Sequence, residues 1–229
     1  MIELDQKEIF LQSQGDSYFL RNKEKLEIQG NERQDVDVTA KYIKSGQKVL
    51  EIGCSHGRNL QYLKGKTGCD CYGIDPSNEA IRSGSKNFPG LNLKVGTAEK
   101  LEYVDGFFDF VLFGFCLFLV DRKFLTRTVA EADRVLKPGG FLGIIDFDVK
   151  TPRRRAWKHY DGVFSYKDDY ASMFTAFPQY TLIERRSYSH TSPEFTIDIE
   201  ERLVVCVIYK ELNVENLSAI FREEETKSD

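Results

Sequence analysis

The sequence predicts an α/β fold in which a doubly wound, mostly parallel, seven-stranded sheet carries helices on both faces. Two observations lead to this prediction. Apolar runs of strand length alternate with segments of helical spacing from residue 48 to residue 147, a pattern typical of right-handed crossovers between parallel strands. The run 108–115 is almost continuously apolar, as is expected for a strand that is covered on both faces.

Strands are expected over 48–53, 70–75, 91–95, 108–115 and 141–147. Helices are expected after Gly57, from Ser77 to about Asn87, and over 121–136. Pro138 and Gly139 end the last of these, because proline cannot continue a helix and glycine tolerates the turn. Beyond residue 150 the pattern weakens to a helix over 167–177 and two β-rich runs, 180–188 and 202–209.

These elements divide the chain into three parts. We expect an N-terminal helical lid or cap over 1–44, the sheet domain over 45–210, and a partly disordered C-terminal extension over 211–229. The extension is predicted from its charged end, which has few apolar residues to bury.

Composition narrows the classes of function. A net charge of -4 and a pI near 5.6 give no footprint for nucleic acid, and the one dense basic cluster, 153–155, is interpreted as a solvated loop edge. No basic, apolar leader opens the chain, and the apolar run 107–120 is too short to span a bilayer. Five cysteines in apolar surroundings indicate reduced thiols. We expect a cytoplasmic protein with no membrane insertion and no metal site; its oligomeric state is not readable.

The residues that carry chemistry are expected at strand ends, since ligands of such sheets bind outside the carboxyl ends of the strands. The first strand runs into Gly53, Ser55 and Gly57, small residues that let the backbone approach a ligand. The second strand ends in Asp75, whose carboxylate can accept both hydroxyls of a ribose. A helix N-cap is the structural alternative for Asp75.

Four segments together resemble the class I S-adenosylmethionine-dependent methyltransferases, which have a Rossmann-like fold. Val49–Gly57 looks like the first motif of that family, and Gly73–Ser77 is similar to the second. Phe108–Val111 and Val135–Gly140 resemble the signatures of the fourth and fifth strands. The resemblance covers about residues 45–150 and implies S-adenosylmethionine as the cofactor. Ser55 departs from the family, in which many members carry glycine.

The resemblance also implies which residues hold the cofactor. Those expected around its methionine end, ribose and adenine are Glu51, Gly53, Ser55, Gly57, Asp75, Pro76, Ala98 and Glu99. Phe113 and Phe115 are expected to wall the sulfonium. The stretch 14–22 is similar to the lid of some small-molecule methyltransferases, in which Tyr18 and Asn22 would close over the cofactor; an amphipathic helix packed on the domain explains it equally well.

Three other interpretations compete with this one. Dinucleotide binding requires glycine at positions 55 and 58, which hold Ser55 and Arg58. The segment 53–57 also matches the Gly-x-Ser-x-Gly elbow of α/β-hydrolases, yet it follows the first strand, and this interpretation leaves Asp75 unexplained. A protein that binds the cofactor without turnover remains open.

Methyl transfer needs mainly positioning, and a hydroxyl acceptor also benefits from a general base. His159 and Asp146, which follow or end the fifth strand, are the predicted candidates, with a surface or structural role as the alternative for His159. The predicted acceptor is a small molecule, first a hydroxyl of a sugar or polysaccharide precursor and second another metabolite or a lipid-linked precursor.

Overall fold

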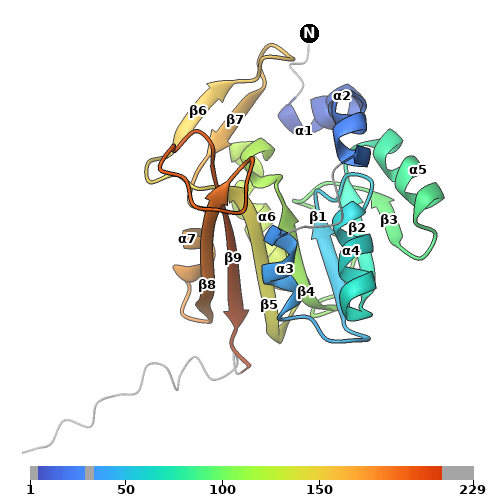
Figure 1. Cartoon of the computed structure of the whole chain (residues 1–229), viewed down its shortest axis with the longest axis vertical. Coiled ribbons are helices and arrows are strands. Elements are labelled where there is room, and N and C mark those ends of the chain that lie inside the picture. Colours follow the sequence, from blue (N-terminus) through green and yellow to red (C-terminus); the bar gives the residue numbers. More distant parts are fainter. Residues whose placement is uncertain (1–4, 29–33, 213–229) are drawn as a thin grey trace, which may run out of the picture.

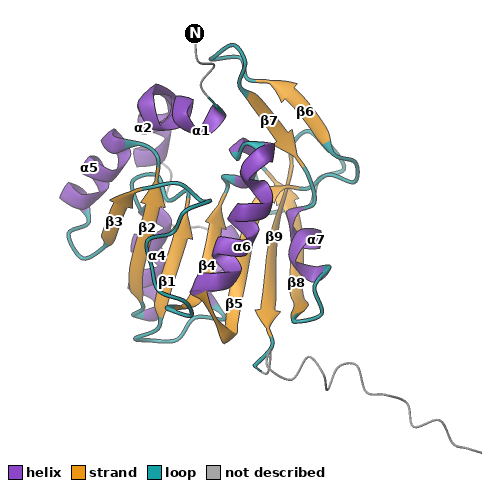
Figure 2. Ribbon diagram, turned by 180° about the vertical axis from the view of Figure 1, so that it is seen from behind, coloured by secondary structure: helices purple, strands orange, loops and turns teal. Residues whose placement is uncertain are grey.

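The computed structural model describes residues 5–28 and 34–212. They form a central sheet between two layers of helices (Figure 1, Figure 2). The sheet has seven strands, as the sequence predicts, and their order is β3-β2-β1-β4-β5-β9-β8. Their bounds are β1 Lys48–Ile52, β2 Asp70–Asp75, β3 Asn92–Val95, β4 Phe108–Gly114, β5 Leu136–Phe147, β8 Tyr180–Ser189 and β9 Arg202–Lys210.

Strands β1 to β5 run parallel, and β9 is antiparallel to both of its neighbours, β5 and β8. From β1 the chain builds outward through β2 to β3, then crosses to β4 on the other side of β1. The strand order therefore reverses between β1 and β4. In open α/β sheets this switch point is where the crevice for a ligand opens, at the carboxyl ends of the strands.

Helices cover both faces of the sheet, as expected. On one face α3 (Gln34–Ala40), α4 (Arg58–Thr67) and α5 (Asn78–Asn87) contribute the buried residues Val36, Leu60 and Ile81 to one core cluster. On the other face α6 (Leu125–Val135) and α7 (Tyr170–Thr175) contribute Val135 and Phe174 to a second cluster. Because both faces are covered, β1 and β4 contain almost only buried residues.

A segment of short helices, α1 (Gln6–Ile9), η1 (Phe10–Gln14) and α2 (Gly15–Ile28), lies across the carboxyl edge of the sheet (Figure 1). We call residues 5–28 the lid segment. The side chain of Gln6 bonds to the Leu119 carbonyl and to both backbone groups of Phe164. The α3 helix packs on the sheet instead, so the lid segment occupies only part of the expected 1–44 region. Of the expected extension, 213–229 lies outside the described residues.

A two-stranded hairpin beside the lid segment was not predicted. It consists of β6 (Arg153–Ala156) and β7 (Phe164–Lys167). The prediction of a loop edge for 153–155 is therefore wrong. The run of three arginines hides the strand, because it lacks the alternation of apolar and polar residues by which strands are recognised. Val163 at the turn is fully buried in a small cluster with Ile9 and Phe10, which anchors the hairpin to the lid segment.

Two element boundaries also differ from the prediction. Strand β5 begins at Leu136 instead of residue 141, because Leu136 already pairs with Phe108; the register then shifts, so that Phe110 pairs with Phe141. The helix expected over 167–177 is limited to α7, since Lys167 belongs to β7.

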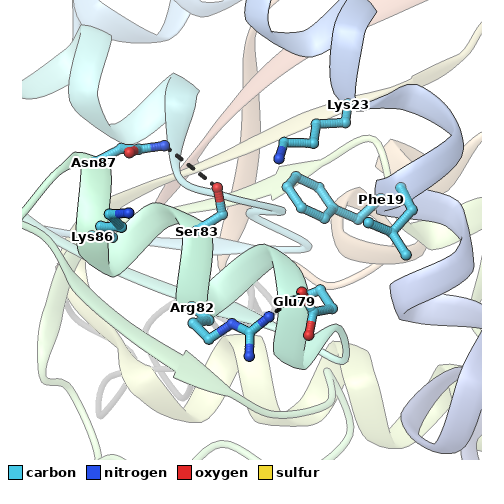
Figure 3. Close-up of a pocket in the computed structure, with 8 residues that line it drawn as sticks. Phe19, Lys23, Glu79, Arg82, Ser83, Lys86 and Asn87 are labelled. Carbon is cyan, nitrogen blue, oxygen red and sulfur yellow. Dashed lines mark hydrogen bonds and ion pairs between the residues drawn. The ribbon is translucent and has the colours of Figure 1, made fainter.

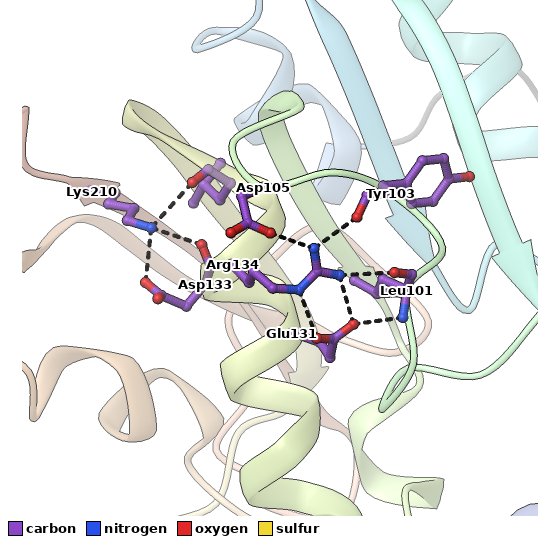
Figure 4. Close-up of polar contacts among 8 residues, drawn as sticks. Leu101, Tyr103, Asp105, Glu131, Asp133, Arg134 and Lys210 are labelled. Atoms are coloured by element: carbon purple, nitrogen blue, oxygen red, sulfur yellow. Dashed lines mark hydrogen bonds and ion pairs between the residues drawn. The ribbon is translucent and has the colours of Figure 1, made fainter.

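The loop from β3 to β4 is fixed to α6 by Arg134 (Figure 4). The Arg134 guanidinium donates to the carbonyls of Leu101 and Tyr103 and to the carboxylates of Asp105 and Glu131, at 2.7–2.9 Å. Glu131 in turn accepts from the Leu101 amide at 2.7 Å. This network holds the loop whose first residues, after β3, line the carboxyl edge.

Over the ranges 5–28 and 34–212, no helix combines the length and apolar character that a bilayer crossing needs. Within the same ranges, no three His, Cys, Asp or Glu side chains converge as metal ligands would.

Two glycines inside helices provide a test of this packing. A Cβ at Gly84 of α5 would lie 2.3 Å from the His56 carbonyl oxygen and 2.6 Å from Leu93, whereas a Cβ at Gly65 of α4 meets nothing within 4 Å. Gly84→Ala should lower the free energy of unfolding by about 1–3 kcal/mol through overpacking. Gly65→Ala should raise it by up to about 1 kcal/mol through helix propensity. Urea denaturation measures both, and equal stability of the two variants would contradict the close packing of α5 on the β1–α4 turn.

Candidate active site

The turn between β1 and α4 is built by residues with positive φ angles. Gly53 has φ +76°, Ser55 has φ +50° and Gly57 has φ +83°. A Cβ on Gly53 would lie 2.4 Å from the Cβ of Cys116, so this position has no room for a side chain. The chain thus leaves the sheet in a tight turn and starts α4 at once. The amides of Gly53 and Cys54 donate to the Ile74 carbonyl, and the Gly57 amide donates to the Cys54 carbonyl.

Glu51 lies beneath this turn and is fully buried. Its Oε1 accepts a hydrogen bond from the Asn59 side chain at 2.5 Å. Gly114, at the end of β4, packs against the same carboxylate: a Cβ there would come within 2.2 Å of Oε1. Glu51 therefore occupies the switch point between β1 and β4. The predicted set does not include Asn59 and Gly114, although a glycine that ends a strand is a sequence signal for close packing.

Asp75 joins the turns that follow β1 and β2. Its Oδ2 accepts from the Ser55 amide at 2.8 Å, and its Oδ1 accepts from the Ser77 amide at 2.9 Å. Each oxygen keeps a lone pair for a further donor. Burial raises the pKa of Asp75 to about 6, against the two amide bonds, which lower it. Ser77 is the N-cap of α5, through its bond with the Ala80 amide, so the N-cap alternative for Asp75 is wrong.

The lid segment closes over the turn that contains Pro76. A Cβ on Gly15 would lie 3.1 Å from the Ser77 nitrogen and 3.2 Å from the Pro76 carbonyl carbon, so the two backbones are in close contact. Asp16 accepts from the Ser77 hydroxyl at 2.7 Å and from the Glu79 amide at 2.9 Å. The lid segment therefore supplies part of the cap of α5, a role that sequence reasoning missed.

The turn after β3 reaches the lid segment by a salt bridge. Glu99 is buried and accepts from the Thr97 hydroxyl at 2.9 Å. Its carboxylate lies 3.6 Å from the Lys7 ammonium in α1. Ala98, half-buried, packs against the core cluster under β1 and β4. The structure thus brings Ala98 and Glu99 to the same edge of the sheet as Gly53 and Asp75.

The two predicted lid residues are placed differently. The ring of Tyr18 stacks on Trp157 of the hairpin, with centroids 6.2 Å apart. Burial, and after it the nearby charge of Asp75, raise the pKa of the Tyr18 hydroxyl, so Tyr18 lies close to the carboxyl edge. The Asn22 amide donates to the Tyr18 carbonyl in its own helix at 2.8 Å. Asn22 therefore uses this donor for a hydrogen bond within its own helix.

The two aromatic residues predicted at the end of β4 have separate environments. Phe113 is fully buried, with its ring 6.2 Å from Phe174 of α7, so the prediction that it walls a cofactor is wrong. Phe115 has φ +58°, which turns its half-buried side chain to the carboxyl edge. There it meets Phe118 at 4.9 Å and Phe147 at 5.0 Å between ring centroids. We call Phe115, Phe118 and Phe147 the aromatic platform.

A histidine without a sequence signal for a functional role lies against this platform. The exposed ring of His190 is 6.4 Å from that of Phe115, at an interplanar angle of 22°. Its backbone amide bonds to the carbonyl of Glu201, which fixes the loop that follows β8. Local sequence carries no signal for this contact, because it joins residues far apart in the chain.

The two predicted catalytic residues lie in different surroundings. Asp146 is almost completely buried and accepts from the amides of Phe118 and Phe147. Burial raises its pKa to about 7. His159 is exposed on the turn of the hairpin, with its ring 5.4 Å from Trp157. Burial, followed by Arg21 and Lys158, lowers the pKa of His159.

A cavity of about 520 Å³ lies between α2 and α5 (Figure 3). It is lined by Phe19, Leu20, Lys23, Glu79, Arg82, Ser83, Lys86 and Asn87. None of the predicted cofactor residues belongs to this lining. The cavity is thus separate from the constellation formed by the strand ends.

Part of the chain is similar to known methyltransferases. Residues 50–144 match the family described as methyltransferase domain. An uncharacterized methyltransferase of Synechocystis sp. is 34% identical over 104 residues, which are 45% of this chain and 49% of that protein. Phthiotriol/phenolphthiotriol dimycocerosates methyltransferase 1 of Mycobacterium ulcerans is 36% identical over 43% of this chain and 36% of its own. The chain thus spans about half or less of these relatives.

The similarity to solved structures extends over nearly the whole chain. One similar structure is that of the 1,6-didemethyltoxoflavin-N1-methyltransferase of Burkholderia thailandensis, with bound 1,6-didemethyltoxoflavin and S-adenosylhomocysteine. It has a TM-score of 0.70 and 14% identity to this chain. The match covers 92% of this chain and 93% of that one. At this identity the likeness shows the fold alone.

Ser55 separates the hydrolase interpretation from a backbone role. Its buried Oγ has no hydrogen-bond partner among the described residues, so no base activates it there. Ser55→Gly removes a side chain from a left-handed position and should change the free energy of unfolding by less than about 1 kcal/mol. Ser55→Val introduces a β-branched side chain there and should lower the free energy of unfolding by more than that. Chemical denaturation measures both.

A serine-reactive fluorophosphonate should not label the chain; stoichiometric labelling that Ser55→Ala abolishes would establish a nucleophile.

Proposed function

We propose that the protein transfers a methyl group from S-adenosylmethionine to a small-molecule acceptor, because residues 50–144 match the methyltransferase domain family and the fold is similar to that of a methyltransferase solved with S-adenosylhomocysteine. One observation carries this proposal. Asp75 receives the amides of Ser55 and Ser77 at the end of β2 and keeps one lone pair on each oxygen beside the turn that follows β1. This arrangement fits the two hydroxyls of a ribose.

The residues around Asp75 fit the rest of the cofactor. The positive-φ turn from Gly53 to Gly57 has little side-chain bulk, so the methionine end could approach its backbone closely, and the buried Glu51 lies beneath that turn. We assign Ala98 and Glu99, in the turn after β3, to the adenine. The lid segment reaches across and meets the same turns through Lys7 and Asp16. Closure excludes water, which a displacement reaction at a sulfonium requires.

The bound cofactor would supply an activated methyl group: the acceptor atom would bond to the methyl carbon while the carbon–sulfur bond breaks and its electron pair remains on the sulfur. The protein has to hold the acceptor in line with that carbon, roughly 3 Å away. We assign this task to the aromatic platform, because Phe115 turns its ring to the carboxyl edge next to the β1 turn. The half-buried rings of Phe115 and Phe147 would present apolar surface that suits a sugar ring or a planar molecule, and the buried Phe118 supports them.

For the acceptor we propose a hydroxyl of a sugar or polysaccharide precursor, with a lipid-linked precursor as the second choice. The second choice is supported by the Mycobacterium ulcerans relative, which is named a phthiotriol/phenolphthiotriol dimycocerosates methyltransferase. The acceptor proton would pass to His159, whose ring lies beside Trp157, while Trp157 stacks on Tyr18 of the lid segment. The five cysteines are free thiols, which supports a reducing compartment such as the cytoplasm.

Asp75→Ala should weaken the binding of S-adenosylhomocysteine by about ten- to a hundredfold, since hydrogen bonds to a charged group are worth about 1.5–3 kcal/mol. Ser77→Ala is the matched control: it removes the N-cap of α5, which costs about 1 kcal/mol of stability, and leaves the carboxylate in place. Calorimetry and thermal melting measure affinity and stability. Equal affinity losses in both variants would contradict the ribose assignment.

The same carboxylate sets the pH dependence of binding. Ribose hydroxyls donate to the ionised form, so binding lowers the pKa of Asp75 from about 6 and releases protons when the pH is near or below that value. Affinity should therefore be constant above about pH 6 and fall below it, and Asp75→Ala should remove this slope. A slope that survives in Asp75→Ala would assign the titration to another group.

Turnover is tested by incubating the protein and labelled S-adenosylmethionine with pools of nucleotide sugars, phosphorylated sugars and lipid-linked precursors. We expect methyl transfer to a hydroxyl-bearing small molecule. His159→Gln should then lower kcat by about 10²–10⁴-fold, because general-base catalysis is worth that much, without changing the affinity for S-adenosylhomocysteine. Tight cofactor binding with no transfer to any pool would identify a non-catalytic binding protein.

A further inference from the structure

The arginine triplet of the hairpin is divided between two faces. In β6, Arg153 and Arg155 are two residues apart and lie on one face, while Arg154 lies on the other. The Arg154 guanidinium stacks on Phe164, 4.6 Å from the ring centroid. Across the hairpin Arg153 pairs with Lys167 of β7, which puts a third cation on the face of Arg153 and Arg155. We call these three residues the cationic face.

One carboxylate opposes the three charges. Glu200 contacts Arg153 at 2.5 Å, Arg155 at 2.8 Å and Lys167 at 3.4 Å. Within residues 5–28 and 34–212, no other carboxylate lies within ion-pair distance of the cationic face. The cluster therefore carries an excess of two positive charges.

This excess is costly for the protein alone. Like charges directly opposite each other on two strands repel. Lys167 is 7% exposed, so water screens its charge poorly. An anion that binds between the cations would relieve the repulsion that Glu200 leaves uncompensated.

The cationic face lies next to the proposed acceptor position. The Lys167 ammonium is 3.9 Å from the centroid of the Phe147 ring, and the Phe147 ring is 5.0 Å from that of Phe115. A chain of direct contacts thus connects the cationic face to the aromatic platform. A molecule that rests on the platform can reach the cations with an acidic substituent.

We propose that the cationic face binds a phosphate group of the methyl acceptor. This assignment rests on the proposed function, since the platform is taken as the place of the acceptor. A phosphate monoester carries about two negative charges at neutral pH, which matches the excess of two positive charges, whereas a carboxylate carries one. Arginine also provides a planar fork of donors that suits phosphate oxygens.

The experiment titrates the full chain with inorganic phosphate, in the presence of S-adenosylhomocysteine, and follows binding by calorimetry. The double variant Arg153→Gln/Arg155→Gln should weaken phosphate binding by about tenfold or more. Arg154→Gln, on the opposite face of the same strand, is the matched control and should leave the affinity within about twofold. Glu200→Gln removes the resident negative charge and should strengthen binding by about threefold.

Several outcomes would overturn the proposal. Equal losses in the double variant and in Arg154→Gln would indicate an unspecific charge effect, and acetate binding as tight as phosphate would exclude a phosphate site. A weaker affinity in Glu200→Gln would show that Glu200 positions the cations instead of competing with the ligand. S-adenosylhomocysteine binding is measured in the same samples, so a failed phosphate site with intact cofactor binding leaves the proposed function standing.

Discussion

The two amide hydrogen bonds accepted by Asp75 hold the candidate site together. The amides of Gly53 and Cys54 bond to the Ile74 carbonyl, and the Ser55 amide bonds to the Asp75 carboxylate. The turn after β1 is therefore held in place by hydrogen bonds to the end of β2. Its positive φ angles are unfavourable for a residue such as Ser55, and these bonds compensate for that strain. Without them, the turn would lose the geometry that lets a ligand approach its backbone closely.

The lid segment depends on the same turns. Asp16 accepts from the Ser77 side chain and the Glu79 amide just after Asp75, and Lys7 pairs with Glu99 after β3. Its contacts with the edge of the sheet thus include polar groups of the strand ends themselves. Asp16 also adds to the upward pKa shift of Asp75, because two carboxylates lie near each other there. Closing the lid segment and ionising Asp75 are therefore opposed unless donors from a ligand intervene.

The sequence predicts the parts of the site that follow strand periodicity and misses those set by local backbone geometry. Glycines, Asp75 and the β3 turn could be predicted, because parallel strands end at one edge. Phe113 and Phe115 are two residues apart, so alternation would place them on one face. The positive φ of Phe115 breaks that alternation, and the sequence has no signal that predicts a left-handed backbone conformation for a phenylalanine. His190 reaches the same place from a distant loop.

The hairpin connects the two halves of the proposed reaction site. Trp157 on its turn stacks on Tyr18, and Phe164 bonds to Gln6, so one side of the hairpin supports the lid segment. Lys167 on its second strand lies over Phe147 of the aromatic platform. A ligand held by the cationic face would brace the hairpin, and a braced hairpin would stabilise the closed lid segment. Binding of the acceptor and retention of the cofactor would then favour each other, since both act on one two-stranded element.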